Sequence, residues 1–405
     1  MTRSTQAEAG HESALSSALV TRMQARRRDE EHRAATPLEL FFDLSFVVAV
    51  AQAGQQLVHA VADGRPWHGV SGYLLVFFAI WWAWVNFSWF GSAYDNDDVL
   101  YRLATLVQIA GVLVLAAGVP RAFQRNDFAV AVLGYVIMRV AQTTQWLRAA
   151  RGETGAARKA ARAYAAGLVL VQFGWVLLIL APHEVWVWGF GPLGVADMAV
   201  PAIAERIHHT SWHPRHIAER YGLFTIITLG ESVSAATIAV QTALDDHAQV
   251  GALLPIAAGG LIIVFAAYWI YFAVPIHDYV RSNQQAFGWG YGHYLIFGSA
   301  AAIGAGLAVA VQQVTHHSRI SANTAAFAVT IPTALYLATV WLVHLRHFKS
   351  GLLRQAVLPC GALLVLAVSF AGRWAVLTAG LVAAATVAVG VILAARAQLR
   401  RTDAP

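Results

Sequence analysis

The sequence predicts an all-α protein that crosses a membrane many times. Its mean hydropathy is +0.54, and only 12% of its 405 residues are charged. A water-soluble chain carries about 25% charged residues, so this composition is typical of a polytopic membrane protein. The apolar residues gather in twelve stretches. Each stretch is long enough to cross a hydrocarbon core about 30 Å thick with roughly 20 helical residues.

These stretches give the expected order of the helices. They cover residues 37–61, 69–90, 101–121, 127–150, 160–181, 185–204, 216–241, 249–275, 287–314, 323–345, 352–371 and 373–396. The sixth is the weakest of them, because glycines, Pro192 and Asp197 interrupt it. The last two are separated by little more than Gly372-Arg373, which predicts a tight helical hairpin.

The distribution of basic residues predicts the orientation. With the N-terminus inside, the cytosolic segments hold most of the arginines and both lysines, and the outer segments hold only Arg65, Arg121, Arg125, Arg319 and Arg373. The positive-inside rule therefore predicts a multi-pass protein of the inner (plasma) membrane with both termini cytosolic. We expect residues 1–35, which mix basic and acidic side chains, to form a disordered tail, and residues 397–405 to form a short second tail.

The chain between these tails suggests two halves, residues 36–207 and 208–396. Tyr94-Asp95 follows the second stretch, for example, and His277-Asp278 follows the eighth. Six helices per half is an even number, so duplicated halves would share one orientation and form a parallel repeat. The alternative is that aromatic and apolar matches of this kind arise by chance in such a chain.

The first stretch opens with a helix-capping pattern and continues into a buried acid. Thr36 can cap the helix, Pro37 suits its first position and Glu39 stands where a capping box needs it, so Glu39 is predicted to cap. Asp43 lies one turn deeper on the same face and is predicted to join a polar network. A second polar stripe follows nearly opposite: Gln52, Gln55, Gln56 and His59. Either the helix is kinked near Gly54, or the two polar sets have different partners.

Two charges lie midway along apolar stretches, Arg139 in 127–150 and Glu231 in 216–241. A charge at the bilayer centre costs roughly 2.5–3.5 kcal/mol on insertion scales. At 1.5 Å per residue both lie about 16–18 Å from the cytosolic ends of their helices, so we predict a buried Arg139–Glu231 pair. It either holds the two halves together or acts in a transport cycle. The polar neighbours predicted to line a cavity there are Asn86, Gln142, Thr143, Thr228 and Ser232.

Two segments together resemble the bacterial low temperature requirement protein A family. One is TPLELFFDL, from Thr36 to Leu44, and the other is HIAERYGLF, from His216 to Phe224, which continues to LGES at 229–232. The resemblance covers residues 34–396 and implies a many-span inner-membrane protein, with no substrate attached. The signature residues it implies are Glu39, Asp43, Glu219, Arg220 and Glu231. We expect the first four to form a polar cluster at the cytosolic mouth of a cavity.

The most consistent function is a secondary transporter or permease for an unknown small molecule or ion. A membrane-embedded enzyme acting on lipid, using acids at the cytosolic edge, and a non-transporting sensor or scaffold are the alternatives. The single cysteine, Cys360, excludes disulfides and cysteine-based metal clusters, and we expect no cofactor and no bound metal. The lipid bilayer is the predicted partner and nucleic acid is not. The sequence leaves a homo-oligomer open.

Overall fold

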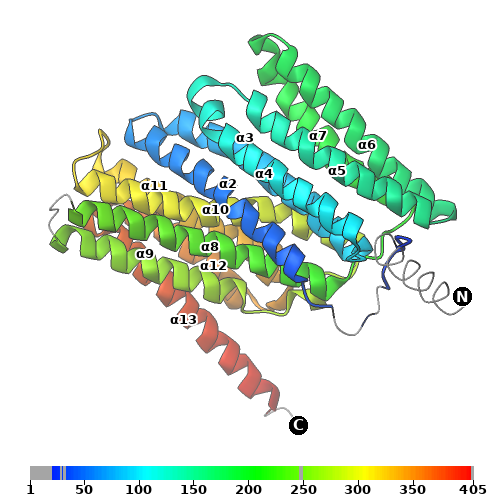
Figure 1. Ribbon diagram of the computed structural model, residues 1–405. Coiled ribbons are helices and arrows are strands. Elements are labelled where there is room, and N and C mark those ends of the chain that lie inside the picture. The colour runs from blue at the N-terminus through cyan, green and yellow to red at the C-terminus, as the bar shows by residue number, and fades with distance from the viewer. Residues whose placement is uncertain (1–20, 28–29, 31–32, 246–249, 403–405) are drawn as a thin grey trace, which may run out of the picture. The chain divides into compact units, whose positions relative to one another are not determined.

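The computed structural model describes residues 21–27, 30, 33–245 and 250–402. This part of the chain folds into twelve long α-helices and contains no strand (Figure 1). The helices are α2 (Pro37–Ala62), α3 (Pro66–Tyr94), α4 (Val99–Arg125), α5 (Ala129–Gly152), α6 (Gly155–Leu180), α7 (His183–Ile207), α8 (Pro214–Asp245), α9 (Val250–Tyr271), α10 (Asn283–Val314), α11 (Ala322–Val340), α12 (Leu352–Ala367) and α13 (Ala375–Thr402). They follow the twelve apolar stretches of the sequence, so the predicted all-α class is confirmed.

Ten of the described helices are long and apolar enough to cross a membrane. The two that fall short are α5 and α7, which carry Arg139 and Asp197 in the middle of their lengths. The polytopic membrane architecture is therefore confirmed with ten candidate spans. The predicted count of twelve depends on α5 and α7, whose hydropathy these buried charges lower.

The chain divides into two compact units whose boundaries lie inside helices. Unit 1 consists of Met1–Ala49 and Trp82–Arg220, and unit 2 of Val50–Trp81 and Tyr221–Pro405. Helices α2, α3 and α8 each contribute residues to both. Each unit thus draws on both of the halves that the sequence suggests.

In unit 1, helices α4 to α7 follow one another as packed neighbours, α4 beside α5, α5 beside α6 and α6 beside α7 (Figure 1). Turns of two or three residues connect them. Gly134 explains the closest of these contacts, because a Cβ at this position of α5 would collide with the backbone of Leu115 on α4. Small residues allow such backbone contact between membrane helices.

In unit 2, α10 packs beside α11, α11 beside α12, and α13 beside both α12 and α9. A Cβ on Gly306 of α10 would overlap the backbone of Ala328 on α11, so this pair also meets backbone to backbone. Helix α11 runs on into a π-turn at Trp341–Leu345 and a 3₁₀ turn at Arg346–Phe348. Two 3₁₀ turns around Gly372 (φ +60°) join α12 to α13, where the sequence predicted a tight hairpin.

Candidate functional site

The first turns of α2 and α8 meet in unit 1 around Arg220. Its guanidinium contacts Asp43 twice, with Nε–Oδ2 and Nη2–Oδ1 distances of 3.0 and 2.5 Å, and its Nη1 lies 3.1 Å from Oε1 of Glu39. Trp84 of α3 donates its indole N–H to Asp43 Oδ1 at 2.7 Å. All four side chains are buried. Each charge therefore has a partner inside the protein, as a charge removed from water requires.

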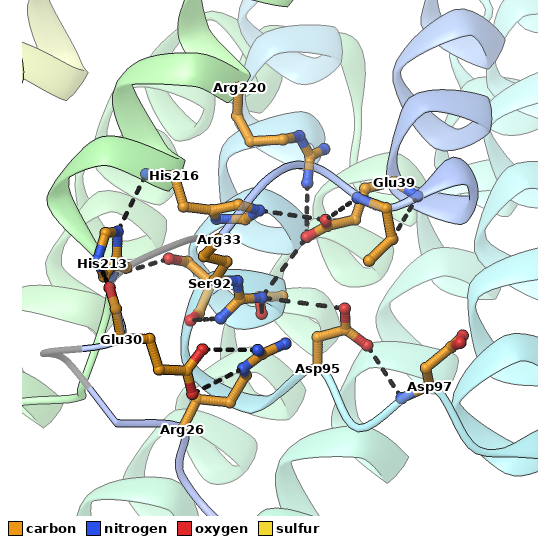
Figure 2. A network of polar contacts seen from close by, with 12 residues as sticks. Arg26, Glu30, Arg33, Glu39, Ser92, Asp95, Asp97, His213, His216 and Arg220 are labelled. Carbon is orange, nitrogen blue, oxygen red and sulfur yellow. Dashed lines mark hydrogen bonds and ion pairs between the residues drawn. The ribbon is translucent and has the colours of Figure 1, made fainter.

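Glu39 belongs to the end of the helix and to the ion cluster at the same time. Its carboxylate accepts the Thr36 backbone N–H at 2.8 Å, while Thr36 Oγ1 accepts the Glu39 N–H at 3.3 Å. These two bonds are the predicted capping box. Oε2 also lies 3.1 Å from His216 Nε2 (Figure 2). Because a carboxylate only accepts, Nε2 of His216 must carry the proton.

The chain before α2 contributes a further arginine to this cluster. Arg33 donates Nη2 to the Gly91 carbonyl at 2.6 Å and Nη1 to the Ser92 carbonyl, near the end of α3. Its guanidinium lies 3.9 Å from the carboxylates of both Glu39 and Asp95 (Figure 2). We call Arg33, Glu39, Asp43, Asp95, His216 and Arg220 the buried cluster.

The N-terminal segment, the described residues among 21–36, is docked on unit 1 by other contacts as well. Arg22 donates to the Gly152 carbonyl through Nε and Nη2, at 3.0 and 2.8 Å. His213 Nε2 donates to the Glu30 carbonyl at 2.9 Å (Figure 2). The sequence predicted a disordered tail over residues 1–35, and the structure instead gives the described part of this segment fixed partners. Residues 1–20 of that tail lie outside the described residues.

Asp95 lies in the turn between α3 and α4, where its Oδ1 accepts the Asp97 backbone N–H at 3.0 Å. Burial raises the pKa of Asp95 to about 6, the negative charge of Glu39 adds to the rise, and the Arg33 guanidinium opposes it. The buried cluster sets two guanidiniums against three carboxylates, so a neutral His216 leaves one negative charge in excess. Protonation of Asp95 would neutralise the cluster.

A second buried centre lies in the middle of unit 1. Arg139 of α5 donates Nη2 to Asp197 Oδ1 of α7 at 2.7 Å and Nη1 to Asn86 Oδ1 of α3 at 3.2 Å. Asp197 also accepts the indole N–H groups of Trp82 and Trp175, at 2.7 and 3.2 Å. The counter-charge of Arg139 is thus Asp197 and not the predicted Glu231. The need for a compensating carboxylate, on which that prediction rested, is met within unit 1.

The other predicted lining residues divide between the two units. Gln142 is buried and Thr143 half-buried on α5 of unit 1. Thr228 and Ser232 are buried on α8 of unit 2, where their hydroxyls donate to backbone carbonyls, Thr228 to Phe224 at 3.0 Å and Ser232 to Ala300 at 2.7 Å. These two hydroxyls therefore satisfy helix backbone within the packed interior.

Glu231 lies in unit 2 at the wall of a cavity with a volume of about 660 Å³. The outer half of α2, the second half of α8 and the end of α10 form the walls. The polar lining residues are Gln55, His59, Asp63, Glu231, Thr242, Gln312, Thr315 and His317. Glu231 precedes Thr242 by eleven residues, which is about 17 Å of helix. The carboxylate is therefore deep in the cavity, and most of the other polar groups lie toward the ends of the helices.

This cavity accounts for the second polar stripe of α2. Gln55 and His59 line it in unit 2, whereas Glu39 and Asp43 on the same helix belong to the buried cluster of unit 1. The two polar sets of α2 thus have different partners, one of the two alternatives that the sequence left open.

Comparison with known proteins gives the family. A family model described as bacterial low temperature requirement A protein (LtrA) matches residues 34–395. The chain belongs to the LtrA family. It is also 28% identical over 220 residues to a protein of Rhizobium meliloti (strain 1021) named "Uncharacterized protein RA0937". That match covers 51% of this chain and 52% of the relative, so it spans about half of the relative's length.

The two LtrA strings are brought together by the buried cluster. The first supplies Glu39 and Asp43, and the second supplies His216 and Arg220, one helical turn apart on α8. Glu219, which the sequence placed with them, is exposed. Sequence reasoning missed His216, which it treated as a loop histidine, and Arg33, which it placed in a tail. It also missed the role of Asp197, although a charge in an apolar stretch was a usable signal.

Proposed function

We propose that this LtrA protein is a secondary transporter and that the cavity of unit 2 is part of its pathway. The observation that carries the proposal is the position of Glu231, a carboxylate at the deep end of a polar cavity between membrane-spanning helices. Ionisable residues at such a depth normally face a water-filled cavity and mark a substrate or ion pathway. With both termini in the cytosol, the polar end of the cavity opens to the outside.

The buried cluster supports a structural role beside this pathway. Arg220, His216 and Trp84 already occupy the carboxylates of Glu39 and Asp43. Those two acids are therefore not free for the lipid chemistry considered from the sequence, and transport remains the better supported function.

The test is solute-driven flux in proteoliposomes. Purified protein is reconstituted with a pH-sensitive dye inside, and representative cations, anions, sugars and amino acids are added outside under an imposed pH gradient. We expect at least one class to change the internal pH or the membrane current. Glu231→Gln should abolish that response, because it removes the charge at the deep end of the cavity and keeps its shape.

Asp278→Asn is the matched control, since Asp278 is a half-exposed carboxylate of unit 2 in the segment between α9 and α10, away from the cavity. It should leave the flux unchanged. No response to any class from folded protein, or equal responses from Glu231→Gln and the unaltered protein, would contradict the proposal.

A further inference from the structure

The inference concerns what the cavity of unit 2 binds, and it rests on the proposed transport function. Glu231 takes part in no ion pair among the described residues of unit 2. Every described lysine and arginine of unit 2 lies in a turn, in a loop or near the end of a helix, at positions 65, 281, 319, 346, 349, 354, 373 and 396. An ionised Glu231 thus has no fixed basic partner at its own depth in this unit.

A carboxylate without a counter-charge at this depth is costly unless it is protonated or meets a cation. None of the described residues that line the cavity is a lysine or an arginine. The lining therefore repels no positive charge, and its deepest group attracts one.

The other polar groups of the lining favour the same kind of ligand. The hydroxyls of Thr242 and Thr315 donate to the carbonyls of Ile238 and Val311, at 3.0 and 3.1 Å. Their protons are already used, so their oxygens offer only lone pairs to a ligand. The amides of Gln55 and Gln312 add carbonyl oxygens. A donor-rich cation such as an ammonium group suits a wall rich in acceptors.

Size and apolar lining distinguish an organic cation from a bare ion. A volume of about 660 Å³ lies in the range of small-molecule sites, roughly 300–1,000 Å³, while one water fills only about 30 Å³ of liquid. Val50, Val58 and Ile238 supply apolar wall beside the carboxylate. We propose that the cavity binds a small organic ammonium ion, with its charge on Glu231 and its carbon skeleton against these side chains.

Carbodiimide labelling tests this without requiring transport. A hydrophobic fluorescent carbodiimide modifies carboxyl groups in membrane interiors, and mass spectrometry locates the modified peptide. The full-length protein is labelled in detergent in the presence of n-butylammonium, n-butanol or Na⁺ at equal ionic strength. We expect n-butylammonium at ten times its dissociation constant to slow labelling of Glu231 about tenfold. Neutral n-butanol and Na⁺ should leave the rate unchanged.

Glu231→Gln should lose the labelled peptide, and Asp278→Asn should be labelled and protected as the unaltered protein is. Labelling that n-butylammonium does not slow would overturn the proposal, and so would equal protection by Na⁺ or by n-butanol. Protection without any solute-driven flux would keep the cation site and overturn transport. Flux without protection would do the reverse.

Discussion

At the scale of single residues, Arg139 shows how a membrane protein accommodates a buried charge. Its guanidinium meets Asp197, and two tryptophan N–H groups complete the shell of that carboxylate. A buried pair of this kind contributes little net stability, but losing one member leaves an uncompensated charge. The pair can therefore be tested by removing each charge alone and then both.

We expect Asp197→Asn and Arg139→Met each to lower the free energy of unfolding by about 3–5 kcal/mol. The double variant should lose much less, because the asparagine still offers an oxygen to Trp82 and Trp175 and no charge is left unpaired. Thermal or denaturant unfolding in detergent measures the double-mutant cycle. Losses that simply add in the double variant would show that the two residues are not coupled.

Asp95 gives a prediction for the dependence of stability on pH. Its pKa rises from the ordinary value of 3.8 to about 6 in the folded protein, so the folded state binds this proton more tightly than the unfolded state. The stabilisation is fully present below about pH 4 and is lost as the pH rises through about 6. Melting temperatures of the unaltered protein and of Asp95→Asn, measured from pH 4 to 7, should converge or diverge mainly within this window. A constant difference across that range would argue against the raised pKa.

At the scale of elements, the sequence predicted the helices well, because each apolar stretch is bounded by charged, glycine or proline residues. It predicted the partners of the charges less well. Glu39 and its cap are local and could be predicted, while the contacts of Glu39 with His216 and Arg33 join residues far apart in the chain. The Arg139–Glu231 prediction matched depth and charge, yet depth along a helix does not say which helices are neighbours.

Arg33 tests the N-terminal segment as an element. It serves as a C-terminal cap of α3 through the carbonyls of Gly91 and Ser92, a role that suits a cation at a helix C-terminus. Arg33→Ala should destabilise the protein by about 3 kcal/mol or more and speed hydrogen exchange over residues 21–36. Arg26→Ala is the control, because its pair with Glu30 is partly exposed and such pairs contribute about 0–1 kcal/mol. Equal effects of the two variants would contradict the assigned role.

At the scale of the whole molecule, the predicted topology can be tested with introduced cysteines. Cys360 is the only native cysteine, so Cys360→Ser gives a clean background. Arg319→Cys, in the loop between α10 and α11, should react with a membrane-impermeant maleimide added outside intact cells. Ser350→Cys, between α11 and α12, should react only after the cells are opened. The reverse pattern would invert the orientation and place the polar end of the Glu231 cavity on the cytosolic side.

The docking of Arg33 also has a practical consequence for anyone shortening this protein. Removing residues up to the start of α2 would look harmless from hydropathy alone, since no apolar stretch is lost. It would nevertheless take one of the two guanidiniums from a cluster of three buried carboxylates. Recombinant forms that keep Arg33 and its neighbours, with any purification tag placed at the opposite terminus, should therefore be the ones that survive extraction into detergent.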